Sequence, residues 1–290
     1  MIKGITDTTK YRSVYNRTTE KAEGILTNEK DVYNSRYVSV EAVTEAYSQI
    51  DQVLHNTINH FNENKVKGFF ITISLKDHIA LFSTLRDLGF TFHNASGDLA
   101  TLVKFLPTNR KNRLPGFCTH YVGVGGLVID FNTDKVLVIK EKGGHDTKGW
   151  KVPGGLVDTG EFLPDAAIRE VFEETGVKTE FLGVLALREK RPYHFGMNDM
   201  YFICLLRPLS SDITQCEFEV SRCAWMSIED FVSSESTKIE TQERVSKLAE
   251  KLVKLNRAGE DINEMCWPFS SVKTILPTVK AEHPMYHSKL

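Results

Sequence analysis

A glycine turn followed by a short, carboxylate-rich helix constrains the fold of this chain more than any other feature of its sequence. After Trp150-Lys-Val-Pro-Gly-Gly155, the spacing of apolar residues predicts a helix over Pro164–Thr175. On this helix Glu170, Glu173 and Glu174 stand at positions i, i+3 and i+4, so their carboxylates share one face. Carboxylates this close repel one another, and the arrangement is typical of a site for hard divalent cations such as Mg²⁺ or Mn²⁺.

The other positions of this helix predict how it is held. Arg169 lies four residues before Glu173, where it can pair with that carboxylate and fix its orientation. Ala166 lies one turn before Glu170, and its small side chain leaves room for a bulky ligand. We expect the opposite face to pack on the core through Ile168, Val171, Phe172 and Thr175.

A solvated acidic face would explain a bare E-x-x-E-E pattern, but here that pattern is part of a longer motif. Its nine positions match by chance on the order of 10⁻⁹ times per window of average composition. The segment Gly155–Val177 resembles the Nudix box, G-x5-E-x7-R-E-U-x-E-E-x-G-U with U aliphatic, without a departure. The nine residues are Gly155, Glu161, Arg169, Glu170, Val171, Glu173, Glu174, Gly176 and Val177.

The resemblance implies an α+β fold, the α/β/α sandwich with a mixed sheet that is typical of Nudix hydrolases. It also implies hydrolysis of the diphosphate bond in a nucleoside diphosphate linked to another moiety. By the same resemblance, Glu170, Glu173 and Glu174 bind Mg²⁺, Glu161 supports the loop and Arg169 orients the carboxylates. The Gly154–Gly155 turn then brings backbone close to the metal or the phosphate.

A general base often lies outside the box in this family. The stretch Cys216-Glu-Phe-Glu-Val-Ser-Arg-Cys-Ala-Trp-Met226 supplies the candidate, and its spacing to the tryptophan favours Glu219 over Glu217. The alternative is an ordinary glutamate at the edge of a strand.

The rest of the chain predicts two domains separated by a linker. Residues 1–37 lack sustained periodicity and are predicted to form an irregular arm. A small α/β domain is predicted over 38–108, with a helix capped by Ser39, and the basic, proline-bracketed stretch Pro107–Pro115 is the predicted linker.

The second domain is predicted over 117–258 and the tail over 259–290. Apolar runs predict its strands, and a stripe at helical spacing predicts a late helix over Thr241–Arg257. The predicted strands are His120–Asp130, Lys135–Lys140, Glu180–Arg188, Asp199–Arg207 and Val220–Met226.

Motifs in both domains resemble one branch of the Nudix family. They are Leu88-Gly-Phe-Thr-Phe-His-Asn-Ala95, the stretch around His120, Trp150–Gly155 and Cys223-Ala-Trp-Met226. That branch includes the antisense basic fibroblast growth factor protein and plant ADP-ribose/NADH pyrophosphatases. Its first domain resembles an acetyltransferase fold, but Ile73–His78 lacks the Gly-rich turn that would cradle a pyrophosphate, so we expect a structural or homodimer-forming role.

Charge and hydropathy limit the partners of this chain. Lys plus Arg number 36 and Asp plus Glu number 38, a formal net charge of −2, which offers no bulk attraction to nucleic acid or to an anionic membrane. The apolar stretches have the length of strands, so no membrane span is predicted. The expected partner is a nucleotide-sugar or dinucleotide substrate.

The final residues Ser288-Lys289-Leu290 match the address read by the peroxisomal import receptor. We therefore expect a peroxisomal protein, with a cytoplasmic protein as the alternative. The branch resemblance favours ADP-ribose or NADH as substrate, releasing AMP. One alternative is a CoA diphosphatase, although Val136–Gly154 lacks the L-L-T-x-R type segment of those enzymes. Another is a catalytically weak nucleotide-sensing or partner-binding protein.

Overall fold

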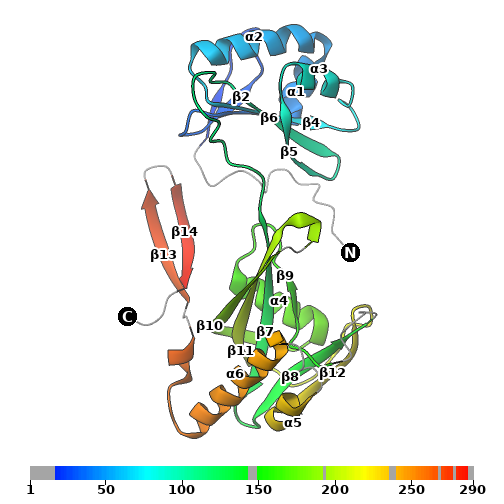
Figure 1. Ribbon diagram of the computed structural model, residues 1–290, viewed down its shortest axis with the longest axis vertical. Coiled ribbons are helices and arrows are strands. Elements are labelled where there is room, and N and C mark those ends of the chain that lie inside the picture. Colours follow the sequence, from blue (N-terminus) through cyan, green and yellow to red (C-terminus); the bar gives the residue numbers. More distant parts are fainter. Residues whose placement is uncertain are drawn as a thin grey trace. The chain divides into compact units, whose positions relative to one another are not determined.

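The computed structural model describes residues 17–142, 149–191, 194–234, 240–266, 269–276 and 279–286. It divides into an N-terminal unit, Met1–Cys118 with Lys273–Ala281, and a C-terminal unit, Thr119–Val272 with Glu282–Leu290 (Figure 1). The predicted peroxisomal tripeptide Ser288–Leu290 lies outside the described residues and stays a prediction.

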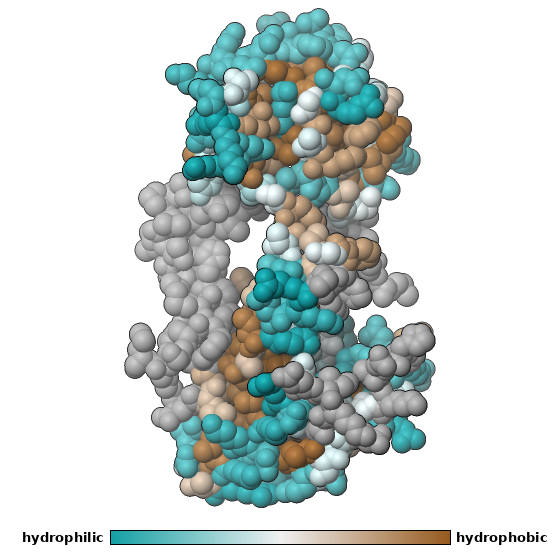
Figure 2. Space-filling view, viewed as in Figure 1, coloured by the Kyte–Doolittle hydropathy of each residue, from teal (hydrophilic) through white to brown (hydrophobic). Residues whose placement is uncertain are grey.

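The N-terminal unit is a six-stranded sheet with helices packed on one face. The strand order is β1-β2-β3-β4-β6-β5, with β3 and β4 parallel. The helices bury Leu54, Phe61 and Leu85 against Phe69 and other residues of the central strands. The outward side of the helix at the top of Figure 2 is polar, as expected for an amphipathic helix. The elements are β1 (Thr18–Glu20), β2 (Asn28–Lys30), β3 (Arg36–Val38), α1 (Val40–Ala46), α2 (Ile50–Glu63), β4 (Gly68–Ser74), α3 (Leu81–Asp87), β5 (Thr91–Ser96) and β6 (Leu99–Phe105).

The irregular arm predicted over residues 1–37 is wrong for its described part. Residues 18–38 contribute β1, β2 and β3, which extend the sheet beyond β4. Each of these strands has three residues, too few to show a period of two in the sequence. The guanidinium of Arg36 is buried within the sheet, where its Nε donates to Glu20 at 2.8 Å.

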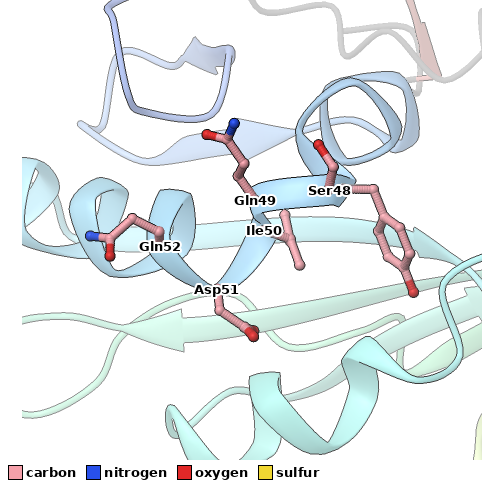
Figure 3. A pocket seen from close by; sticks show the side chains of 6 residues that line it. Ser48, Gln49, Ile50, Asp51 and Gln52 are labelled. Atoms are coloured by element: carbon pink, nitrogen blue, oxygen red, sulfur yellow. The ribbon is translucent and has the colours of Figure 1, made fainter.

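The predicted helix after Ser39 begins as expected but is broken in the middle. The Ser39 hydroxyl accepts from the Ala42 N–H at 3.3 Å, which confirms Ser39 as the N-cap. A 3₁₀ turn over Tyr47–Gln49 then separates α1 from α2. The break forms a hollow of about 340 Å³ lined by the consecutive residues Tyr47–Gln52 (Figure 3).

The C-terminal unit is built on a mixed sheet in the order β10-β11-β7-β8-β12, with β9 pairing beside β7. β11 and β7 are parallel and the other described pairs are antiparallel, which makes the sheet mixed. The elements are β7 (His120–Asp130), β8 (Lys135–Glu141), β9 (Gly154–Leu156), α4 (Leu163–Thr175), β10 (Thr179–Lys190), β11 (Asn198–Pro208), β12 (Val220–Ser227), α5 (Ile228–Ser233) and α6 (Glu240–Arg257).

Alternating side chains of this sheet form two separate cores. Leu127 and Ile129 pack with Phe231 of α5 and Leu252 of α6 on one face. Val128 and its neighbours pack against α4 on the other face. Because successive strand residues point to opposite faces, helices cover both sides of the sheet and the predicted α/β/α sandwich is confirmed.

The described residues near the C-terminus form a two-stranded hairpin of β13 (Phe269–Leu276) and β14 (Val279–Tyr286). None of the helices in the described ranges combines the length and the apolar character needed to cross a bilayer.

Candidate active site

Gly154 and Gly155, which were predicted to form a turn, instead lie in the strand β9, which pairs antiparallel with β7 and precedes the loop to the acidic helix α4. The N–H of Gly154 donates to Glu174 Oε2 at 2.7 Å, which fixes one carboxylate of α4 against β9. Gly154 has φ 153°, and a Cβ atom there would lie 2.1 Å from the Val124 carbonyl oxygen and 2.8 Å from the Gly125 Cα. Only glycine therefore permits this close approach of β9 to β7.

We expect Gly154→Ala to destabilise the C-terminal unit by about 3 kcal/mol, because the added methyl group meets backbone atoms that cannot rotate away. Gly160→Ala is the matched control: Gly160 also has a positive φ of 79°, but nothing lies within 4 Å of an added Cβ atom. Gly160→Ala is expected to lower the free energy of unfolding by about 1 kcal/mol, from backbone strain alone. Urea unfolding followed by tryptophan fluorescence measures both, since Trp150 and Trp225 belong to the C-terminal unit. Equal losses in the two variants would contradict the steric argument.

Arg169 organises the acidic residues around it. Its Nε and Nη2 donate to the two carboxylate oxygens of Glu161, both at 2.8 Å, and its Nη1 donates to Glu170 Oε1 at 2.8 Å. The predicted contact with Glu173 is also present but longer, at 3.3 Å. The hydrogen bonds from Arg169 keep the pKa of Glu161 below its usual range. Arg169 therefore links the loop residue Glu161 to the carboxylates of α4. It makes the predicted contact with Glu173 and, in addition, the contacts with Glu161 and Glu170.

Glu170 lies directly against the Gly155 backbone. A Cβ atom on Gly155 would lie 2.6 Å from Glu170 Oε2, so glycine is required for this carboxylate to keep its position. Burial raises the pKa of Glu170, while the Arg169 guanidinium opposes that rise and the charges of Glu173 and Glu219 add to it. The Glu170 carboxylate is therefore partly desolvated and surrounded by like charge.

Glu174 is the most buried carboxylate of the helix, with 5% of its surface exposed. Burial raises the pKa of Glu174 to about 7, and the positive charge of Lys151 and the Gly154 N–H only partly offset this effect. Its ordinary value is 4.5. A desolvated carboxylate with this pKa is poised to become a full anion when a cation binds beside it.

The oxygen ligands of these carboxylates suit a hard divalent cation, although the described side chains do not surround a common point. Carboxylate oxygens of Glu170 and Glu174 are the ligand type that Mg²⁺ prefers. Within the described ranges, no three His, Cys, Asp or Glu side chains converge as a ready-made metal cage. The side chain of Glu173 is 60% exposed, and Glu170 is held by Arg169. Glu170 and Glu174 would hold the ion, and Glu173 lies at the solvent side of the same face.

Two expectations about α4 are wrong. Ala166 is fully buried in the core that packs on the sheet and leaves no room for a ligand. Phe172, which we expected in the core, is 48% exposed. Both differences have the same reason: the helix is rotated so that Ala166, Ala167 and Val171 contact the sheet, which a helical periodicity alone does not determine.

Three residues of the site were not found by sequence reasoning. Lys151 forms an ion pair with Glu141, and both charges act on Glu174. Tyr201 of β11 places its ring beside Gly123 and Gly125, whose missing side chains make space for it. The only sequence signal for these residues was the small-residue pattern Gly123-Val-Gly-Gly126.

Glu219, the predicted general base, is exposed in the turn before β12. Its charge raises the pKa of Glu170, so it lies within electrostatic range of the acidic face of α4. Its backbone carbonyl accepts from the Lys142 N–H at 2.8 Å, which joins the turn to the end of β8.

Two domain models and several known proteins match this chain. A NUDIX domain model matches residues 119–248, and a Nudix hydrolase domain model matches residues 26–106. The human protein named nucleoside diphosphate-linked moiety X motif 6 is 45% identical over 152 residues, which is 52% of this chain and 48% of that protein. Nudix hydrolase 7 of Arabidopsis thaliana is 33% identical over 212 residues, which is 72% of this chain and 74% of that protein. The crystal structure of a MutT NUDIX hydrolase from Burkholderia pseudomallei shares 23% identity with a TM-score of 0.36, covering 43% of this chain and 97% of that chain.

The chain belongs to the Nudix hydrolase family, as the matches to both units and to the Arabidopsis protein show. This confirms the resemblance drawn from Gly155–Val177. The matched region spans about half the length of the human relative.

Proposed function

We propose that the C-terminal unit hydrolyses the diphosphate bond of a nucleoside diphosphate derivative in a Mg²⁺-dependent reaction, with ADP-ribose or NADH as substrate and AMP as one product. The observation that carries this proposal is the pair Glu170 and Glu174, held by Arg169 and by Gly154 of β9. Bound Mg²⁺ would screen the negative charge by which a diphosphate resists attack by water.

The other residues of the site would hold the carboxylates in position and accept a proton from the attacking water. Arg169 keeps Glu161 and Glu170 in fixed positions through charge-assisted hydrogen bonds. The Gly154 N–H fixes Glu174, so neither metal-binding carboxylate has to reorganise during the reaction. Glu219 would accept the proton of the attacking water as the phosphorus–oxygen bond to the leaving phosphate breaks.

The substrate proposal rests on the branch resemblance and on a missing segment. Val136–Gly154 lacks the L-L-T-x-R type pattern of CoA diphosphatases. The intact set of box carboxylates argues against a protein that only senses nucleotides, because a sensor has no need of desolvated, mutually repelling acids.

We expect kcat/KM for ADP-ribose or NADH to exceed that for CoA by about tenfold or more, which corresponds to about 1.4 kcal/mol in transition-state binding. A panel of the three substrates at equal Mg²⁺, with products identified by mass spectrometry, measures it. Reactions with EDTA in place of Mg²⁺ serve as the control. A tenfold preference for CoA would contradict the substrate, and no turnover of any member would contradict the activity itself.

A further inference from the structure

Arg188 of β10 is a cation near the candidate active site that the Nudix box does not include. Its Nη2 donates to the carboxylate of Asp199 in β11, and the two side chains form an ion pair. The Asp199 side chain is 4% exposed, whereas 38% of the Arg188 side chain is exposed. Because a buried carboxylate is costly unless it is paired, Asp199 fixes the guanidinium in one position while part of Arg188 stays accessible.

The surroundings of this pair differ from those of a second Arg–acid pair on the same two strands. Arg207 of β11 pairs with Glu180 of β10 at the opposite end of their ladder, and both side chains are about half exposed. A link between the strands therefore needs no buried carboxylate. Among the described residues, the buried Nε of Arg188 has no hydrogen-bond partner. A guanidinium carries five N–H groups and the bond to Asp199 uses one, so Arg188 is held in place and still has donors to offer.

Tyr201 of β11 connects Arg188 to the strand β7. Arg188 lies opposite Tyr201 in the ladder of β10 and β11, and its Cζ is 5.0 Å from the centroid of the Tyr201 ring. On the other side, Tyr201 pairs with Gly123 of β7. A Cβ atom on Gly123 would lie 2.8 Å from a ring carbon of Tyr201, and one on Gly125 would lie 2.7 Å from its hydroxyl oxygen. The ring therefore runs along β7, and its hydroxyl lies at Gly125.

Gly125 is also the residue beside which β9 holds a carboxylate of α4. It pairs with Gly154 of β9, whose N–H donates to Glu174 Oε2 at 2.7 Å. Burial raises the pKa of Tyr201, the charge of Glu174 adds to the rise, and the charge of Arg188 opposes it. The Tyr201 hydroxyl is therefore within electrostatic range of both groups. Arg188 lies at the same end of the sheet as the proposed metal-binding carboxylates, next to the ring whose hydroxyl faces them.

The chemistry of the proposed substrate gives the free donors of Arg188 a use. Glu170 and Glu174 would balance the two positive charges of a Mg²⁺ ion, which leaves the negative charge of the diphosphate to other cations. The planar fork of a guanidinium matches phosphate oxygens and forms charge-assisted hydrogen bonds with them. We propose that Arg188 binds phosphate oxygens of the substrate diphosphate, and that Asp199 and Tyr201 position its guanidinium. This role rests on the proposed function of the same site.

Steady-state kinetics with ADP-ribose test the role of Arg188. Removing Arg188 alone would leave Asp199 buried without its partner, so the test variant is Arg188→Gln/Asp199→Asn, which removes both charges and nearly keeps the side-chain volumes. We expect KM to rise about tenfold with kcat within about twofold, because a contact made equally in the ground state and the transition state changes KM alone. Arg207→Gln/Glu180→Gln removes the matched pair at the other end of the strands and should leave KM unchanged. An equal rise in both variants would show only a structural effect and overturn the proposal.

Binding in EDTA separates this proposal from the proposed hydrolysis, because the Mg²⁺-dependent reaction is then absent and ADP-ribose stays intact. Isothermal titration of the full chain should show ADP-ribose binding about tenfold weaker in Arg188→Gln/Asp199→Asn, with adenosine binding unchanged because adenosine carries no phosphate. Equal weakening for both ligands, or equal ADP-ribose binding by variant and wild type, would overturn the role of Arg188. Wild-type protein that shows the expected binding but hydrolyses no substrate of the panel would contradict the proposed hydrolysis and still support Arg188 as a diphosphate-binding residue.

Discussion

Replacing Glu174 with Gln is expected to lower Mg²⁺-dependent hydrolysis by about 100-fold or more, the scale seen when a key charge-stabilising group is removed. The amide keeps the shape of the side chain and can still accept the Gly154 hydrogen bond, but it carries no negative charge for a cation. Glu170→Gln should have a comparable effect, because Glu170 is the second carboxylate beside the glycines of β9. Steady-state kcat/KM with the preferred substrate of the panel, at saturating Mg²⁺, measures both.

Glu180→Gln is the matched control for these variants. Glu180 lies on β10 in the same unit, is exposed, and pairs with Arg207 on the surface. The same chemical change there should leave activity unchanged. Activity of Glu174→Gln close to that of the wild type would exclude Glu174 from the metal site.

The same substitution is expected to have the opposite effect on stability when metal is absent. In the folded protein burial raises the pKa of Glu174 to about 7 from an ordinary value of 4.5. Between these two pH values the folded state holds the proton that the unfolded chain has released, so the free energy of unfolding falls as pH rises through this window. A shift of this size corresponds to a loss of up to about 3 kcal/mol above pH 7.

Glu174→Gln removes the titrating carboxyl group and with it this pH-dependent loss of stability. In EDTA the variant should therefore be more stable than the wild type at about pH 8 and similar to it at about pH 4.5. Urea unfolding followed by tryptophan fluorescence measures the difference in the C-terminal unit, and other titrating groups cancel between the two proteins. Mg²⁺ should then stabilise the wild type and not the variant, because a ligand stabilises the state that binds it. Identical pH profiles for the two proteins would contradict the raised pKa of Glu174.

Local patterns in the sequence predicted the elements that carry the site. The strand His120–Asp130 has the predicted bounds, and α4 begins one residue before its predicted start and ends at the predicted Thr175. Gly176, with φ 72°, ends the helix in the left-handed conformation that favours glycine. The regular spacing of Glu170, Glu173 and Glu174 identified the family and the acidic face before any contact was known.

Contacts between residues that are far apart in the chain could not be predicted from local patterns in the sequence. The sequence placed Arg169 next to Glu173, but the guanidinium binds Glu161 more closely, because the loop before α4 folds back over the helix. Lys151, in the segment before β9, and Tyr201, in β11, both interact electrostatically with Glu174, and nothing in their own neighbourhoods in the sequence marks them. Pairing across a sheet depends on the register of segments that are far apart in the chain.

The sequence by itself determined the family, the helix with its three carboxylates and the glycines beside them, because each depends on spacing within one short segment. Only the tertiary structure decided that Glu174 is buried while Glu173 is exposed, since burial depends on the angle at which α4 meets the sheet. It also decided that the short strands of residues 18–38 complete the N-terminal sheet, and that the predicted linker lines a cavity with its cations. Periodicity is a local property of the chain, whereas desolvation and the placing of charges depend on every segment packed around a residue.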